Sequence, residues 1–105
     1  MAYRVNIEKA TLNNKAYRKV LYTTKQQQLV VMNLQPNDFI HKENHSSTTQ
    51  FIRIEKGAGI AVVDDITYRL TEGTVLMIPQ NTWHFIKNTS NESLQLYTIY
   101  SPPEH

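Results

Sequence analysis

Apolar residues recur at every second position along most of this chain, in short runs rich in β-branched and aromatic residues. This alternation is typical of strands with one buried face, whereas a helix would place apolar residues three and four apart. It predicts eight strands, over residues 17–23, 29–35, 51–55, 59–63, 66–70, 75–78, 83–87 and 94–99. Because turn-forming residues separate these runs at short, regular intervals, the pattern predicts an all-β fold of antiparallel strands, either a sandwich or a barrel.

Two stretches depart from the alternation of the strands. Asp64-Asp65 lies between two apolar runs and predicts a two-residue hairpin, although Gly is the usual residue at its second position. Residues 8–19 are the one candidate for a helix, but their apolar side chains form no continuous stripe. We therefore predict a loop or a single turn there, and an N-terminal arm over residues 1–16 of a single domain that spans residues 1–105.

The composition limits the chemistry that is available. The chain has 105 residues, of which 40% are hydrophobic, and it contains no cysteine. One modest core fits this length. Without cysteine there are no disulfides, thiolate nucleophiles or cysteine-based zinc sites, so His, Asp, Glu and amide oxygens are the side chains left to bind a metal.

The charge pattern argues against two classes of partner. Eleven Lys and Arg and nine Asp and Glu are scattered along the chain, and the longest basic run is Arg18-Lys19, so we predict no nucleic-acid binding. No strictly apolar stretch exceeds four residues, whereas a bilayer span needs about 20, so we predict no membrane association. Residues 1–10 lack the apolar core of a secretory signal, which makes the cytoplasm the expected location.

Four side chains of metal-binding type stand out because the strand pattern points them inward. Glu43 and His45 are two residues apart in an extended segment, so both point to one side. Gln50 and His84 each alternate in phase with the apolar residues of their own strands and are expected to face the core. Burying them without partners would be costly, so they must contact each other, a water or a metal.

The spacing of the first three resembles the first sequence motif of the cupin family. In that motif two His one residue apart are followed by a Glu and later by a Gly, and here Glu43, His45, Gln50 and Gly57 stand at those positions, within residues 43–57.

Residues 73–88 resemble the second cupin motif, G-x5-P-x-G-x2-H-x3-N, through Gly73, Pro79, His84 and Asn88. The resemblance covers about residues 33–100, and the pair of motifs is more specific than either one. The chain resembles small single-domain members of the RmlC-like cupin superfamily, of cupin type 2, several of which are named mannose-6-phosphate isomerase-like.

The resemblance implies a jelly-roll barrel, an antiparallel double-stranded β-helix, that holds one divalent metal through Glu43, His45, Gln50 and His84. Glu43 replaces a His of the family motif and Gln50 replaces its Glu, so the total ligand charge is kept. Asn81 replaces a Gly where a left-handed backbone is expected, and Asn tolerates that conformation best after Gly. Nitrogen and oxygen ligands leave Mn, Fe, Ni, Zn and Co as candidate metals.

Two functions follow from this resemblance. The first is a metal-dependent enzyme acting on a sugar or another small polar metabolite, by isomerase-like, epimerase-like or dioxygenase-like chemistry at an open coordination position. The second is a non-catalytic module that binds a small ligand in its barrel. The residues identify no general base, so the sequence leaves open whether the protein is an enzyme.

Each candidate residue also has a structural interpretation. His45 and His84 would then be core histidines bonded to backbone carbonyls, Gln50 would support a ligand instead of binding the metal, and Glu43 would be a solvated turn carboxylate. His41 has the same parity as Glu43, but we expect it at the surface.

Trp83 and Phe85 alternate with His84 and are therefore expected on the outer face of their sheet. Large apolar groups there need a cover, either the N-terminal arm or another subunit. We predict a homodimer formed through an outer sheet face.

Overall fold

The computed structural model describes residues 1–103, and the side chains of all of these except residue 42. Within this range the chain forms one helix and nine strands. In order they are α1 (Ile7–Asn13), β1 (Arg18–Thr23), β2 (Gln28–Leu34), β3 (Phe39–Glu43), β4 (Thr49–Lys56), β5 (Gly59–Val63), β6 (Ile66–Leu70), β7 (Val75–Ile78), β8 (His84–Asn88) and β9 (Leu94–Ser101).

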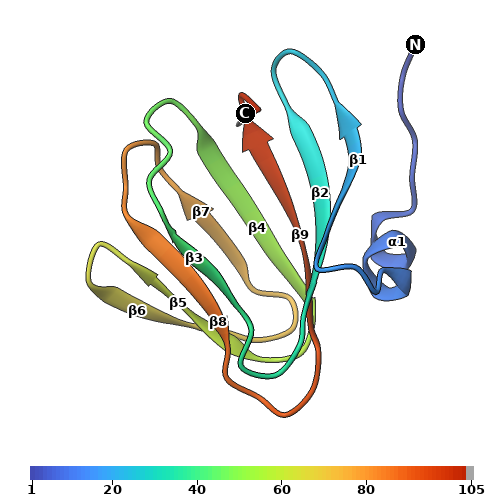
Figure 1. Cartoon of the computed structure of the whole chain (residues 1–105). Helices are drawn as coiled ribbons and strands as arrows, with labels where there is room; N and C mark the ends of the chain where they lie inside the picture. The colour runs from blue at the N-terminus through green and yellow to red at the C-terminus, as the bar shows by residue number, and fades with distance from the viewer. Residues whose placement is uncertain (104–105) are drawn as a thin grey trace.

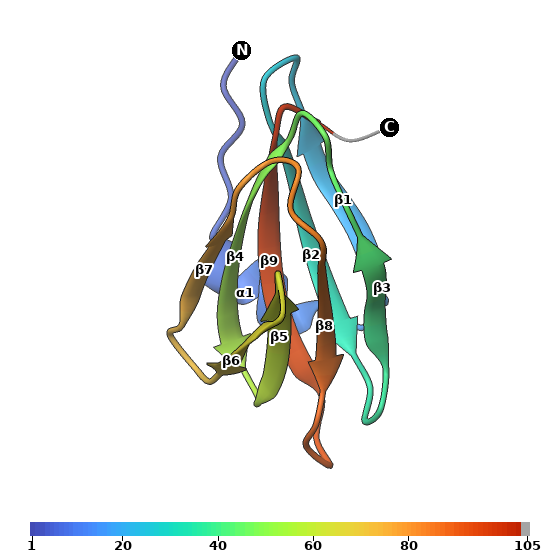
Figure 2. The same cartoon turned by 90° about the vertical axis from the view of Figure 1, so that its left-hand side faces the viewer.

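The strands form two antiparallel sheets that face each other. One sheet has five strands in the order β1-β2-β9-β4-β7, and the other has four in the order β3-β8-β5-β6. Successive strands often lie in different sheets, so the chain winds between two layers, as Figures 1 and 2 show. This is the all-β, antiparallel double-stranded β-helix that the sequence predicts, and the fold prediction is confirmed.

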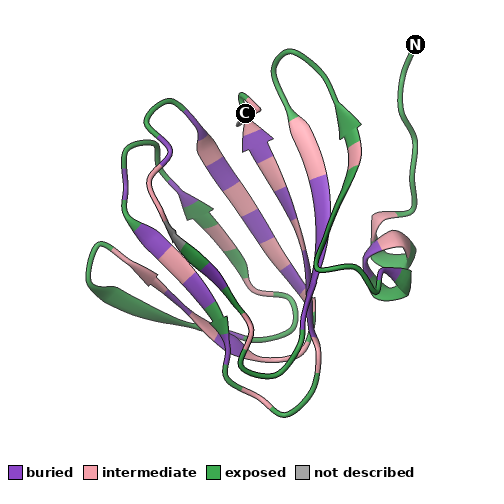
Figure 3. Cartoon of the chain, in the orientation of Figure 1, coloured by how far each residue is buried: buried purple, intermediate pink, exposed green. Residues whose placement is uncertain are grey.

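The core lies between the two sheets. Burial alternates along β4 and β8, where every second residue is buried, and Figure 3 shows this alternation on both strands. The apolar core residues come from both sheets: Val30, Met32, Leu34, Ile40, Ile52, Ile54, Ala61, Leu70, Ile78, Ile86, Leu94, Leu96 and Tyr100. Gln50 and His84 occupy the same inward positions near one end of the barrel and are 1% and 2% exposed, as their alternation predicts.

The N-terminal arm differs from the expected loop or single turn, because it contains the helix α1. Asn6 caps it by accepting a hydrogen bond from the backbone N–H of Lys9 at 3.0 Å. At the other end, the Gln95 side chain on β9 donates to the carbonyls of Thr11 and Leu12 at 3.3 and 2.9 Å. Tertiary contacts thus hold a seven-residue helix that its own apolar pattern would not predict. No helix in the described range is long enough to cross a bilayer.

Strand β3 is absent from the eight strands that the sequence predicts. Only Ile40 of this strand is described as buried, so the segment offers little apolar alternation. It is an edge strand, paired with β8 alone, and its pairing is irregular between Ile40 and Glu43. Cross-strand pairing with β8 therefore forms the strand that carries Glu43 into the barrel.

Two turn predictions are confirmed by backbone geometry. Asp64 and Asp65 form the two-residue connection between β5 and β6, and both have positive φ, 46° and 68°, as a type I′ turn requires. Asn81 has φ of 59°, the left-handed conformation expected at the position where the family motif has Gly.

Candidate metal centre

The candidate ligands meet at one end of the barrel because of strand register. In the four-stranded sheet, Glu43 on β3 is the cross-strand partner of His84 on β8. In the five-stranded sheet, Gln50 on β4 is the partner of Tyr100 on β9. His45, in the loop after β3, joins the two sheets, because its ring meets the ring of Tyr100 edge-on with centroids 5.7 Å apart.

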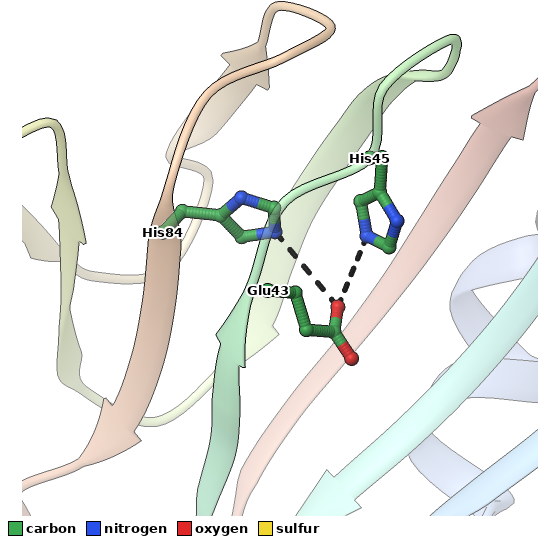
Figure 4. A group of neighbouring side chains, drawn as sticks. All are labelled: Glu43, His45 and His84. Carbon is green, nitrogen blue, oxygen red and sulfur yellow. Dashed lines mark ion pairs between the residues drawn. The ribbon is translucent and has the colours of Figure 1, made fainter.

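Glu43, His45 and His84 converge on a common point, as Figure 4 shows. Oε2 of Glu43 lies 3.0 Å from Nε2 of His45 and 3.9 Å from Nε2 of His84. One possible ligand atom from each residue lies within 4.8 Å of the others. This group can hold a metal ion with two nitrogen ligands and one oxygen ligand. The Glu43 side chain is 38% exposed, so the site is reached from solvent on that side.

The His84 ring is oriented by its own backbone neighbourhood. Its Nδ1 lies 3.0 Å from the carbonyl oxygen of Thr82, so Nδ1 carries the proton and donates it. Nε2 is then an acceptor, and it is buried with no hydrogen-bond donor among the described residues. Burial lowers the pKa of His84; the Thr82 carbonyl opposes that shift, and the nearby His45 reinforces it. The neutral imidazole is therefore favoured, which is the form that binds a metal.

The two sequence motifs also touch through their backbones. The N–H of Asn81 donates to the carbonyl oxygen of His45 at 2.6 Å. The left-handed conformation of Asn81 belongs to the turn that makes this contact, so the turn before β8 fixes the loop that carries His45. His45 is 8% exposed.

Gln50 points into the barrel from the five-stranded sheet and is oriented by Thr98. Its Nε2 donates to Oγ1 of Thr98 at 3.1 Å, and its Oε1 is buried with no hydrogen-bond donor among residues 1–103. A buried amide oxygen and a buried imidazole nitrogen without donors are costly unless a cation or a donor meets them. The residues present therefore fit a divalent metal, with Gln50 as a possible fourth ligand.

Sequence reasoning missed three residues that support this site: Thr82, Thr98 and Tyr100. The inward parity of the last strand could have revealed Thr98 and Tyr100, whereas the contact of the Thr82 carbonyl has no sequence signal. Burial, together with the negative charge of Glu43, raises the pKa of Tyr100. His41 lies at the surface, as expected, with its ring edge-on to Phe39 at 4.8 Å.

Comparison with known proteins agrees with this geometry. A family model described as the cupin domain matches residues 30–100. Protein L612 of Acanthamoeba polyphaga mimivirus is 49% identical over 98% of this chain, and YrkC of Bacillus subtilis is 37% identical over 96%. This chain spans 67% of the mimiviral protein and 58% of the bacterial one.

A solved structure extends the comparison to the whole fold. The crystal structure of BH2720 from Bacillus halodurans is 34% identical, with a TM-score of 0.97, and the match covers all of this chain and 84% of that one. The family match spans most of the sequence, the two motifs meet at one end of the barrel, and the relatives align along nearly the full length of this chain. The chain belongs to the cupin family.

Proposed function

We propose that this cupin binds one divalent transition metal through Glu43, His45, Gln50 and His84, and that the bound metal faces a small polar ligand. One observation supports this most strongly: His84 Nε2 and Gln50 Oε1 are buried with no hydrogen-bond donor in the described part of the chain, and His84 Nε2 lies 3.9 Å from Oε2 of Glu43. Two neutral imidazoles, one amide oxygen and one carboxylate give a donor set suited to Mn, Fe, Ni, Zn or Co.

A metal held here would act as a Lewis acid toward a ligand oxygen. The chain's own residues set the conditions for that chemistry. The Thr82 carbonyl orients His84, and the Thr98 hydroxyl orients Gln50. Isomerase-like and dioxygenase-like reactions on a small metabolite are the catalytic hypotheses. Membership of the mannose-6-phosphate isomerase-like subgroup is also a hypothesis.

The test is elemental analysis of protein purified without an affinity tag. We expect close to one equivalent of a divalent metal per chain, and its loss in His84→Ala. The matched control is His41→Ala, which removes an exposed histidine and should keep the metal. Urea unfolding of the metal-free proteins checks that His84→Ala is folded. Protein that is metal-free as purified, and whose melting temperature responds to no divalent ion, contradicts the proposal.

The competing function is a non-catalytic module that binds a small ligand in the barrel. A binding module and an enzyme would share this fold, but the module would bind its ligand and release it chemically unchanged. Co-purification of one small molecule, identified by mass spectrometry and recovered unaltered after incubation with the metal-loaded protein, would favour this function over catalysis.

We also propose a homodimer. α1 packs on β2, β4 and β9 of the five-stranded sheet, so it does not cover the outer face of the other sheet. There Trp83 is 52% exposed and Phe39 is 45% exposed. Of the two covers that the sequence suggests for this apolar face, the N-terminal arm and another subunit, a second copy of the chain then remains. A monomeric mass by size-exclusion chromatography with light scattering at micromolar concentration would refute the homodimer.

The cytoplasmic location stays a prediction.

A further inference from the structure

Beside the candidate metal centre, the inner face of the five-stranded sheet is polar over three adjacent strands. Tyr100 on β9 has Gln28 of β2 as its cross-strand partner on one side and Gln50 of β4 on the other. Directly opposite residues of neighbouring strands share a face, so these three side chains form a continuous row. Tyr100 is 6% exposed, and its ring contacts His45.

Arg18 reaches this row from the edge strand β1. It is the partner of Met32, a core residue, so Arg18 points to the inner side. Its positive charge acts on the Tyr100 hydroxyl and opposes the rise in the pKa of Tyr100 that burial causes. The next residue, Lys19, is the partner of Val31 and points to the opposite face. Arg18 is exposed, so a ligand can approach its guanidinium from solvent.

Gln28 adds an acceptor that has no donor. Its Nε2 donates to Oγ1 of Thr23 at 3.1 Å, whereas its Oε1 is buried without a hydrogen-bond donor among the described residues. A buried acceptor in this state calls for a hydroxyl or N–H group from a bound molecule. Arg18 on β1 and Gln28 on β2 both lie on the same side of Tyr100 in the sheet. A guanidinium and a buried acceptor near one tyrosine suit a ligand with both an anionic group and a hydroxyl group.

We propose that Arg18, Tyr100 and Gln28 form a subsite for a small hydroxycarboxylate next to the metal centre. Arg18 binds the carboxylate, the Tyr100 hydroxyl donates to it, and Gln28 Oε1 accepts from the ligand hydroxyl. The assignment deepens the proposed function, since it names the ligand class for the same site. A carboxylate suits a single guanidinium better than a phosphate does, because a phosphate carries more charge close to the Glu43 carboxylate.

The experiment measures binding of glycolate to the metal-loaded and the metal-free protein by NMR titration. We expect Arg18→Gln to weaken glycolate binding by about 10- to 100-fold, the effect of losing a charge-assisted hydrogen bond. Lys19→Gln is the matched control, because it removes the same charge one residue along on the opposite face, and it should bind like the unmodified protein. Both variants should keep the metal stoichiometry.

Three further probes complete the test. Glycolamide lacks the charge and acetate lacks the hydroxyl, so each should bind at least several-fold more weakly than glycolate, and Tyr100→Phe should weaken glycolate in the same way. Equal losses in Arg18→Gln and Lys19→Gln, equal binding of glycolate and glycolamide, or tighter binding of inorganic phosphate would overturn the subsite. If no metal binds, the proposed function fails by itself, and an Arg18-dependent affinity of the metal-free protein for glycolate still decides the subsite.

Discussion

Nδ1 of His84 lies 3.0 Å from the backbone carbonyl oxygen of Thr82, two residues earlier in the chain. This contact assigns the proton to Nδ1 and directs the lone pair of Nε2 toward Glu43, whose Oε2 is 3.9 Å away. A backbone group fixes the tautomer, so substitution of the Thr82 side chain would leave the contact in place. The ring is thereby oriented for a metal before any metal binds.

The pH dependence of stability should report the burial of His84. Burial lowers its pKa in the folded protein below the ordinary 6.5, so the unfolded chain binds more protons near that pH. The contribution of His84 to the free energy of unfolding is therefore complete above the unfolded pKa and is lost as the pH falls through 6.5 toward the folded pKa. Urea unfolding of the metal-free protein at several pH values between about 7.5 and 5 measures this slope. His84→Asn should flatten the slope; an unchanged slope would show that His84 does not cause it.

Thr98 should affect metal affinity without being a ligand. Thr98→Val removes the acceptor that holds the Gln50 amide, so we expect metal affinity to fall about tenfold or more, as is common when an outer partner of a ligand is lost. Thr98→Ser keeps the hydroxyl and should retain most of the affinity. Competition with a chelator of known affinity measures both, and equal affinity in the Val and Ser variants would argue against direct ligation by Gln50.

Two glycines with positive φ should differ sharply in their tolerance of alanine. Gly57 has φ of 100°, and an added Cβ would lie 2.5 Å from the carbonyl oxygen of Ser93. Gly73 has φ of 84°, and an added Cβ there meets nothing within 4 Å. We expect Gly73→Ala to cost about 1 kcal/mol from backbone strain alone, and Gly57→Ala about 3 kcal/mol because a backbone clash is added. Denaturant unfolding tests the difference, and equal losses would place the effect in the backbone conformation only.

The β5–β6 hairpin offers a stabilising substitution. Asp65 has φ of 68° at the second position of the turn, where Gly is preferred, so Asp65→Gly should raise the free energy of unfolding by about 0.5 kcal/mol. Asp65→Ala, which keeps a Cβ and loses the side-chain polarity that tolerates this conformation, should lower it. A melting temperature that rises for Ala and falls for Gly would contradict the turn assignment.

Much of the barrel is predictable from local pattern. Period-two alternation located the strands that have a buried face, and the inward parity of Gln50 and His84 follows from counting along their strands. The strand β3 was not predicted because its apolar and polar residues alternate only weakly, and its pairing with β8 defines it as a strand. The helix α1 was not predicted because Gln95, more than eighty residues away in sequence, satisfies its last carbonyls.

The sequence alone determined the fold class, the inward-facing candidates and their possible donor chemistry, because alternation and residue type are local properties. Only the tertiary structure decided that Glu43, His45 and His84 converge, because convergence depends on the register between β3 and β8 and on the loop held by Asn81. It also decided which atoms are left for a ligand. Thr82 and Thr98 form hydrogen bonds with His84 Nδ1 and Gln50 Nε2. The other polar atoms of these two side chains, His84 Nε2 and Gln50 Oε1, are therefore buried with no donor within residues 1–103.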